Sequence, residues 1–203
     1  VLVAKLARYD QQPDRAEKMS LLVSDRFFES YSQVLQNDLP QNIGTFRIDR
    51  SSLTDTEMNT QIKAKLNDNP MVAVYTGHGS PGVWASTSVF SVTDAANLTN
   101  SQLSFYLLTT CLNGYTHNSN NDSLSEAAMK NPNGGAIAVW ASSGTNFPDS
   151  QSAASRRAMN LIFNHQNEQI RIGDIVRQSK LATTDQDVRR NYIFLGDPTV
   201  YIK

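Results

Sequence analysis

The chain has 203 residues, enough for one α/β domain with a substantial core. Its 18 basic and 19 acidic side chains give a formal net charge of -1, so no global field favours nucleic acid or an anionic membrane as a partner. No apolar run approaches the roughly 18 residues that a membrane-spanning helix needs, which argues against membrane insertion. The single cysteine, Cys111, excludes a disulfide within this chain and a zinc site built from several cysteines.

The first ten residues, VLVAKLARYD, form an apolar opening that is typical of a strand. They lack the long apolar stretch and the small-residue cleavage site of a signal peptide. No initiator Met precedes them, so we expect this domain to come from a longer precursor. We find no internal repeat, and we expect residues 1–203 to form a single domain.

Five runs rich in Val, Ile, Leu and aromatic residues recur between helical patterns. They are nearly continuous rather than alternating, which is typical of central strands in a parallel sheet that helices cover on both faces. The sequence therefore predicts an α/β fold with a mostly parallel central sheet. The runs are SLLVSD (20–25), GTFRID (44–49), MVAVYTG (71–77), LSFYLLTTC (103–111) and GGAIAVWAS (134–142).

Helical patterns connect these runs. Apolar side chains three and four residues apart predict a helix over FFESYSQVLQNDL (27–39), and Thr54 and Asp122 are expected to start two more. Two further helical segments, SAASRRAMNLIFNHQ and IGDIVRQSKLATT, follow the fifth strand. The closing YIFLGDPTVYI predicts two short strands joined by a Gly-Asp-Pro turn.

Two reactive side chains follow neighbouring strand patterns. His78 comes just after MVAVYT, flanked by Gly77 and Gly79, and Cys111 ends FYLLTTC. If the two strands are parallel, both side chains emerge at one sheet edge, one or two strand spacings of about 4.8 Å apart. An imidazole beside a thiol promotes thiolate formation and can later protonate a leaving amine. The N–H groups of Gly79 and Cys111 can point at an oxyanion, so the pattern predicts acyl transfer.

Other interpretations compete with this one. A lone cysteine is more often a buried small hydrophobe, and a turn histidine more often bonds to the backbone. The other two histidines are weaker candidates: His117 lies in a polar, Asn-rich loop, and His165 is expected to end a helix, where the helix dipole favours a cation.

Four blocks in this order resemble the gingipain-type cysteine peptidases of caspase-like fold. They are YTGHGS followed by Trp84, LLTTCLNGY (107–115), LSEAAMKNPNGGAIAVWASSG (124–144) and FLGDPTVYI (194–202). The resemblance implies a three-layer caspase-like sandwich, with residues 71–203 as a catalytic lobe and 1–70 as a less certain first lobe. It also implies a cysteine endopeptidase that works through a thioester, with Cys111 as nucleophile, His78 as its partner and Gly79 completing the oxyanion site.

The same resemblance suggests further site residues. Asp25 is expected to orient the histidine, or else to cap a helix, and Glu126 to be structural. Trp84, Ser142, Phe147 and Asp149 are candidates to bind substrate, although Trp84 can instead pack beneath the histidine loop and Asp149 can serve a turn. Glu29 is another possible anion, but a short loop makes an Arg or Lys preference doubtful. The chemistry implies no cofactor; a structural calcium near Asp122 is possible.

Two rival functions remain open at this point. A sortase-like transpeptidase of a bacterial secretion system would form the same thioester and pass it to an amine. A catalytically silent module would keep the fold only to bind partners. The resemblance further implies a protein or peptide substrate, a bacterial protein that is secreted or held at the cell surface, and flanking domains or a propeptide in the same precursor.

Overall fold

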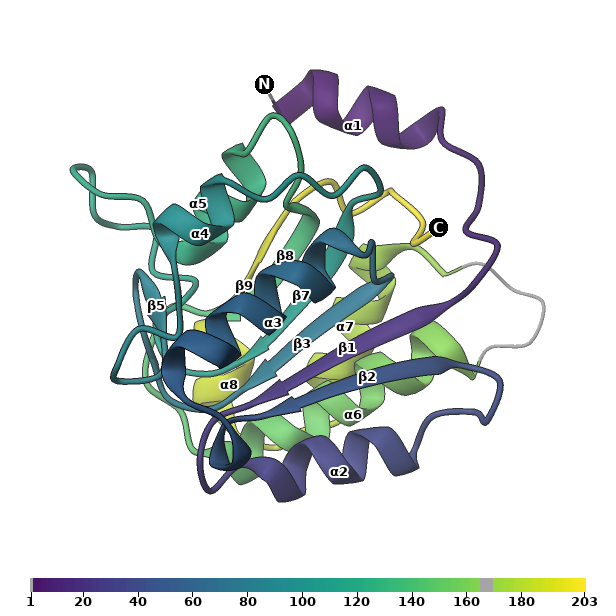
Figure 1. Cartoon of the computed structure of the whole chain (residues 1–203). Coiled ribbons are helices and arrows are strands. Elements are labelled where there is room, and N and C mark those ends of the chain that lie inside the picture. Colours follow the sequence, from purple (N-terminus) through teal and green to yellow (C-terminus); the bar gives the residue numbers. More distant parts are fainter. Residues whose placement is uncertain (1, 165–169) are drawn as a thin grey trace.

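The computed structural model describes residues 2–164 and 170–203 and shows three layers around a six-stranded sheet (Figure 1). The strand order is β2-β1-β3-β7-β8-β9, and all neighbours are parallel except β8 and β9. The five predicted strands are confirmed as β1 (Met19–Ser24), β2 (Gly44–Asp49), β3 (Val72–Thr76), β7 (Ser104–Thr109) and β8 (Ala136–Ser142). Because β1 pairs with β3, residues 1–70 and 71–203 contribute to the same sheet.

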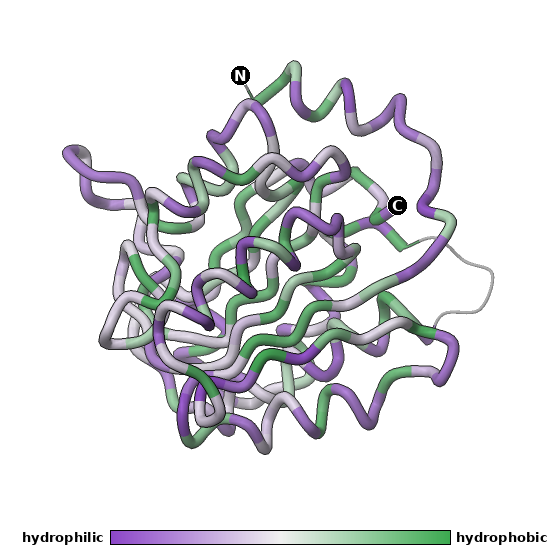
Figure 2. Tube along the Cα trace, viewed as in Figure 1, coloured by the Kyte–Doolittle hydropathy of each residue, from purple (hydrophilic) through white to green (hydrophobic). Residues whose placement is uncertain are grey.

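Helices cover both faces of the sheet and enclose two cores. One core packs α2 (Glu29–Asn37), α6 (Pro148–Phe163) and α7 (Ile172–Leu181) on the sheet. The other packs α3 (Asp55–Asn67), α4 (Val92–Ala96) and α5 (Leu124–Lys130) on the opposite face. Successive residues of the interior strands alternate between the cores, so these strands are largely apolar (Figure 2), whereas the edge strand β2 is mostly half-buried or exposed.

The helix starts follow from local capping. Thr54 and Glu57 form a capping box at the start of α3, as predicted. The start of α5 was predicted wrongly: its N-cap is Ser123, in a capping box with Glu126, because the Ser123 hydroxyl reaches the third helical N–H. Helix α6 begins at Pro148, earlier than its apolar pattern suggested, and the predicted helix-end residue His165 lies outside the described residues.

The opening segment is not a strand as predicted but a helix, α1 (Leu2–Asp10). Its buried side chains, Lys5 and Tyr9, are four residues apart and therefore lie on one helical face. The Lys5 ammonium donates to the carbonyls of Ala128 and Met129, at 3.0 and 3.1 Å, in the last turn of α5. Helical geometry satisfies these carbonyls with one cation, which a strand could not place there.

Several short elements were not predicted. The hairpin strands β4 (Gly79–Ser80), β5 (Val83–Trp84) and β6 (Phe90–Ser91) form a small antiparallel sheet after β3. The 3-10 turn η1 (Arg50–Ser52) follows β2, and α8 (Gln186–Asn191) precedes β9. At the end of the chain β9 (Tyr192–Leu195) is confirmed, but the second predicted strand is only an isolated bridge between Arg171 and Tyr201.

Within the described ranges, no helix combines the length and apolar character needed to cross a bilayer.

Burial of Lys5 predicts a specific pH dependence of stability. Burial, and to a lesser extent Arg8, lowers the pKa of Lys5 from 10.5 to about 8 in the folded state. Between these two pH values the unfolded chain holds a proton that the folded chain has lost, so folding becomes more favourable as the pH rises. Denaturant titrations should show wild type gaining up to about 3 kcal/mol over this window relative to Lys5→Met. Parallel pH profiles for the two proteins would contradict the assignment.

Candidate functional site

The register of two central strands brings His78 and Cys111 together. Strands β3 and β7 pair in parallel with Thr76 opposite Thr109, and the Gly77 N–H extends the ladder to the Thr109 carbonyl at 3.2 Å. His78 and Cys111 therefore each lie two residues beyond a paired threonine, on adjacent strands about 4.8 Å apart. The His78 side chain is exposed and Cys111 is half-buried, so both are accessible from the carboxyl edge of the sheet.

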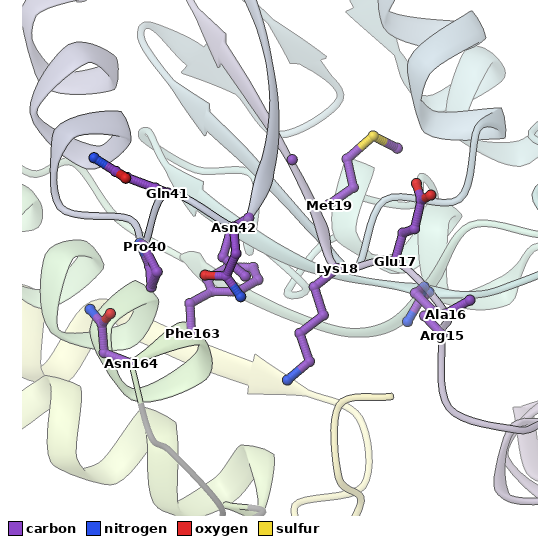
Figure 3. Close-up of a pocket in the computed structure, with 12 residues that line it drawn as sticks. Arg15, Ala16, Glu17, Lys18, Met19, Pro40, Gln41, Asn42, Phe163 and Asn164 are labelled. Carbon is purple, nitrogen blue, oxygen red and sulfur yellow. The ribbon is translucent and has the colours of Figure 1, made fainter.

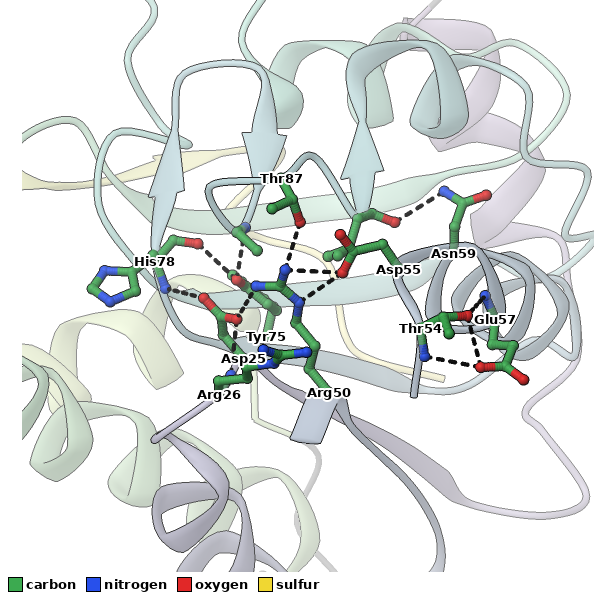
Figure 4. Close-up of polar contacts among 12 residues, drawn as sticks. Asp25, Arg26, Arg50, Thr54, Asp55, Glu57, Asn59, Tyr75, His78 and Thr87 are labelled. Atoms are coloured by element: carbon green, nitrogen blue, oxygen red, sulfur yellow. Dashed lines mark hydrogen bonds and ion pairs between the residues drawn. The ribbon is translucent and has the colours of Figure 1, made fainter. Parts of the chain in front are cut away.

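The histidine loop is held through its main chain. The His78 carbonyl accepts from the Tyr75 hydroxyl at 2.6 Å and from the Ala85 N–H at 2.8 Å. The His78 N–H donates to the Asp25 carboxylate at 3.3 Å (Figure 4). The imidazole itself meets the Phe28 ring edge-on, with centroids 5.1 Å apart.

We expected Asp25 to orient the imidazole directly, but it does not. Its buried carboxylate binds the His78 main chain and pairs with Arg50 at 2.7 Å. The helix-capping alternative does not hold either, because the N-cap of α2 is Phe28 and has no side-chain hydrogen bond. The ends of β1 and β3 are adjacent, so the short Asp25 side chain reaches the neighbouring backbone before it reaches the ring.

Gly79 joins the histidine and cysteine loops. A Cβ on Gly79 would lie 2.5 Å from the Thr110 hydroxyl and 3.1 Å from the Cys111 carbonyl, so only glycine fits. Gly79 pairs with Trp84, and the Ala85-to-His78 bond makes this a non-hydrogen-bonded pair. The Gly79 N–H is therefore not hydrogen-bonded to β5 and can donate towards the space between the histidine and cysteine loops.

The chain turns sharply after Cys111. Leu112 has φ of +61°, and the Asn113 N–H donates back to the Cys111 carbonyl at 2.8 Å. The Cys111 thiol donates to the Asn146 carbonyl at 3.7 Å, and the buried Gln151 donates to the same carbonyl. Cys111 is therefore presented on a strained turn rather than sealed in the core.

Asn113 is a site residue that the sequence analysis missed. Its buried amide donates to the carbonyls of Ser80 and Val83, at 2.6 and 3.2 Å, and so ties the cysteine loop to the β4–β5 hairpin. Its position two residues after the cysteine was the available signal, but an Asn in a polar loop is ordinary.

Two of the predicted substrate-binding residues are corrected, because Trp84 and Ser142 are fully buried. Trp84 stacks on Tyr75 with ring centroids 4.4 Å apart, and therefore packs beneath the histidine loop. The Ser142 hydroxyl bonds to both main-chain groups of Gly144 and accepts from the Asn146 amide. Both side chains shape loops that a substrate would meet, but neither offers a surface to it.

The other two candidates are exposed. Phe147 is 79% exposed at the N-cap of α6. Asp149, in the first turn of α6, accepts from the Tyr31 hydroxyl at 2.6 Å, and this bond raises the pKa of Tyr31. Because Tyr31 packs near Phe28, the contact links α6 to the helix beside His78. Glu29 is half-buried at the start of α2.

The remaining candidates lie away from this site. His117 is exposed beside Tyr115, and Asp122 pairs with Lys130 at 2.5 Å. In the described part of the chain, no three His, Cys, Asp or Glu side chains cluster as metal ligands, so a calcium site near Asp122 stays a prediction. A hollow at the opposite edge of the sheet is lined by residues 15–19, 40–44 and 163–164 (Figure 3).

Comparisons with known proteins agree with this geometry. The model for peptidase family C25 matches residues 1–203. The crystal structure of the Arg-specific cysteine proteinase gingipain R (RgpB) has a TM-score of 0.82 at 20% identity, over 100% of this chain and 52% of that one. The complex of Porphyromonas gingivalis RgpB pro- and mature domains gives 0.79 at 19% identity, covering 100% and 53%.

A third solved structure, described as a protease, has a TM-score of 0.77 at 17% identity and covers 99% of this chain and 52% of its own. The comparison with curated proteins found no match. The chain thus spans about half the length of the solved structures that it resembles. The likeness confirms the predicted caspase-like, three-layer fold.

The close approach of the histidine and cysteine loops predicts that a methyl group added at Gly79 destabilises the fold. Gly79→Ala should lower the free energy of unfolding by about 1–3 kcal/mol, because its Cβ collides with Thr110. Thr110→Ala removes the colliding atoms, so the double variant should recover most of the loss, as measured by chemical denaturation. Strictly additive losses would show that the two loops do not touch here.

Proposed function

Because the chain belongs to peptidase family C25, we propose that it is a cysteine endopeptidase in which Cys111 and His78 form the catalytic dyad. The observation that carries the proposal is the register of β3 and β7, which places an accessible imidazole and an accessible thiol one strand apart. Retention of both groups at one sheet edge is what thiol-dependent acyl transfer needs.

The chemistry follows from the groups present. The Cys111 thiol gives its proton to His78, and the thiolate sulfur attacks the carbonyl carbon of the scissile peptide. The Gly79 and Cys111 N–H groups stabilise the resulting oxyanion. Collapse breaks the C–N bond, His78 returns its proton to the leaving amine, and a thioester remains. Water, activated by His78, then hydrolyses the thioester and releases Cys111.

The Asn146 carbonyl belongs to the resting state of this cycle. A carbonyl accepts a hydrogen bond from a thiol but has nothing to accept from a thiolate. The 3.7 Å contact therefore holds the thiol proton until His78 takes it. Gln151 donates to the same carbonyl and keeps it in place when the contact to sulfur is lost.

The two alternatives make different demands on the same site. Transpeptidation would use the same dyad and thioester, with an amine in place of water. A silent module would need neither group exposed, so the exposed His78 and half-buried Cys111 weigh against it.

We also propose a location, substrates and partners for the longer protein to which we expect this chain to belong. We expect a secreted or surface-held bacterial protein that acts on protein or peptide substrates. Since one similar structure contains pro- and mature domains, we also expect a propeptide or flanking domain as a partner. The proposal requires no cofactor for the chemistry and leaves room for a structural calcium.

Peptide cleavage is the direct test. A diverse fluorogenic peptide library, with reductant and calcium present, should be cleaved by wild type, while Cys111→Ala and His78→Ala lose at least about a thousandfold in kcat/KM. Under the transpeptidase alternative, an amine acceptor added to the assay should yield the transpeptidation product in preference to the hydrolysis product. If wild type cleaves nothing and iodoacetamide labels Cys111 slowly, the silent module is the better description.

The loops beside the dyad favour an apolar substrate side chain. Phe27 is 90% exposed and precedes Phe28, which contacts His78. Phe147 is 79% exposed and follows Asn146, which contacts Cys111. Asp25 is buried and paired with Arg50, so its carboxylate is not available to a basic substrate side chain, and one oxygen of the exposed Asp149 is already engaged by the Tyr31 hydroxyl. Two exposed aromatic rings bind aliphatic or aromatic groups by removing apolar surface from water.

Substrates with a large apolar residue next to the scissile bond should therefore be cleaved faster than their Arg or Lys counterparts. Phe147→Ser should raise KM for the apolar peptides by about tenfold and leave KM for basic ones unchanged. The matched control is Tyr115→Ser, another partly exposed aromatic, in the polar loop after Cys111. A preference for Arg or Lys that survives Phe147→Ser would contradict the assignment.

A further inference from the structure

We propose that Arg50 is a positioning residue for His78, an inference that rests on the proposed dyad. Arg50 lies in η1, directly after β2, and is only 7% exposed. Its guanidinium makes three contacts on three different segments (Figure 4): the Asp25 carboxylate at 2.7 Å, the Asp55 carboxylate at 2.9 Å and the Thr87 hydroxyl at 2.6 Å. Two of these three contacts lead to the main chain of His78.

The first path ends at the His78 N–H. One Asp25 oxygen accepts from Arg50, and the other accepts from the His78 N–H at 3.3 Å. Asp25 is buried, and an unpaired buried carboxylate is costly, so the contact with Arg50 stabilises it there. Arg50, together with the Arg26 N–H that donates to the same oxygen at 2.8 Å, therefore fixes the orientation of the group that holds the His78 nitrogen.

The second path ends at the His78 carbonyl. Thr87 lies in the turn between β5 and β6, between Ala85 and Ser88, which have φ of +58° and +63°. The Ala85 N–H donates to the His78 carbonyl at 2.8 Å. By donating a hydrogen bond to Thr87, the guanidinium stabilises the β5–β6 turn that presents the Ala85 N–H. Both main-chain groups of His78 are thus anchored, through short paths, on one side chain.

Only arginine suits this position. A guanidinium presents five donors in a planar fork and stays charged, so it can serve three acceptors at fixed angles. A lysine keeps the charge but is a single point that cannot reach the three acceptors with the same geometry. The third contact, to Asp55 at the start of α3, lies on neither path, although the Thr87 hydroxyl also bonds to Asp55. An Asn oxygen at this position can still accept from Arg50 and Thr87, so Asp55→Asn provides a control within the same cluster.

The test compares Arg50→Lys with Asp55→Asn by steady-state kinetics on the best library peptide. Arg50→Lys should lower kcat about 10- to 100-fold, with KM changed less than about threefold, because misplacement of a catalytic group affects the transition state more than substrate binding. Asp55→Asn should keep kcat within about twofold. The idea is wrong if folded Arg50→Lys retains kcat within twofold, if its effect lies in KM, or if Asp55→Asn loses as much kcat.

Thr87→Val covers the case in which Arg50→Lys fails to fold, since it removes only a hydroxyl, with its hydrogen bonds to Arg50 and Asp55, from an exposed turn. It should lower kcat about three- to tenfold, and an unchanged kcat would overturn the proposal. Arg47→Lys serves as the matched arginine control, because Arg47 pairs with Asp49 on β2 and, in the described part of the chain, its guanidinium contacts neither Asp25 nor Thr87.

Amide hydrogen exchange separates this proposal from the peptidase assignment. Exchange at the His78 N–H should become at least tenfold faster in Arg50→Lys and stay unchanged in Asp55→Asn. If wild type cleaves no peptide but this pattern appears, the role of Arg50 in placing His78 stands and the peptidase assignment fails. If wild type cleaves peptides but the His78 amide is equally protected in all variants, the positioning role fails alone.

Discussion

The parallel pairing of β3 with β7 is the constraint on which the site depends. Both strands are fully buried, so their register is specified by two cores at once: a shift by one residue would move every side chain to the opposite face. With Thr76 opposite Thr109, the next residues of both strands must leave the sheet together. The distance between His78 and Cys111 is therefore set by packing energy far from either side chain, and the loops need only refine it.

That refinement is mostly a matter of main-chain contacts. Gly79 lets the two loops touch, Asn113 bonds to the hairpin beside the histidine, and Asp25 and Tyr75 grip His78 at its N–H and carbonyl. Main-chain anchoring leaves the imidazole free of strong hydrogen bonds to carboxylates in the described part of the chain. A ring held at its base and packed against Phe28 can still rotate between the thiol and a leaving group.

The sequence predicted the elements that are governed by burial. Five predicted runs became strands of the sheet, four of them in its interior and β2 at its edge, and the placement of His78 and Cys111 at one end of their strands followed from parallel topology alone. The opening helix was missed because its pattern is short and apolar, and its helical form depends on Lys5 capping α5 over 120 residues away. Trp84 and Ser142 were misjudged because a position beside the histidine or cysteine loop does not reveal on which side of the loop a side chain lies.

Backbone strain is concentrated where this chemistry would occur. Of the five described non-glycine residues with positive φ, four lie in the segments that follow β1, β3 and β7: Phe27, Ala85, Ser88 and Leu112. Each such residue costs about 1–3 kcal/mol and persists only where its surroundings over-determine it. Three of the four have a visible consequence: Phe27 is turned outwards beside Phe28, Ala85 aims its N–H at the His78 carbonyl, and Leu112 turns the chain so that Asn113 can bond to the hairpin.

The cluster around Arg50, in which Arg50 and Asp25 are buried, is part of what offsets this strain. The guanidinium, two carboxylates and a hydroxyl satisfy one another on segments that would otherwise be loosely packed. An apolar cluster of the same volume can be equally stable, because the desolvation of charges costs most of what their attraction provides. Apolar packing cannot fix direction, whereas hydrogen bonds at fixed angles orient the His78 loop. A misplacement of about 1 Å is enough to slow a reaction of the proposed kind about a hundredfold.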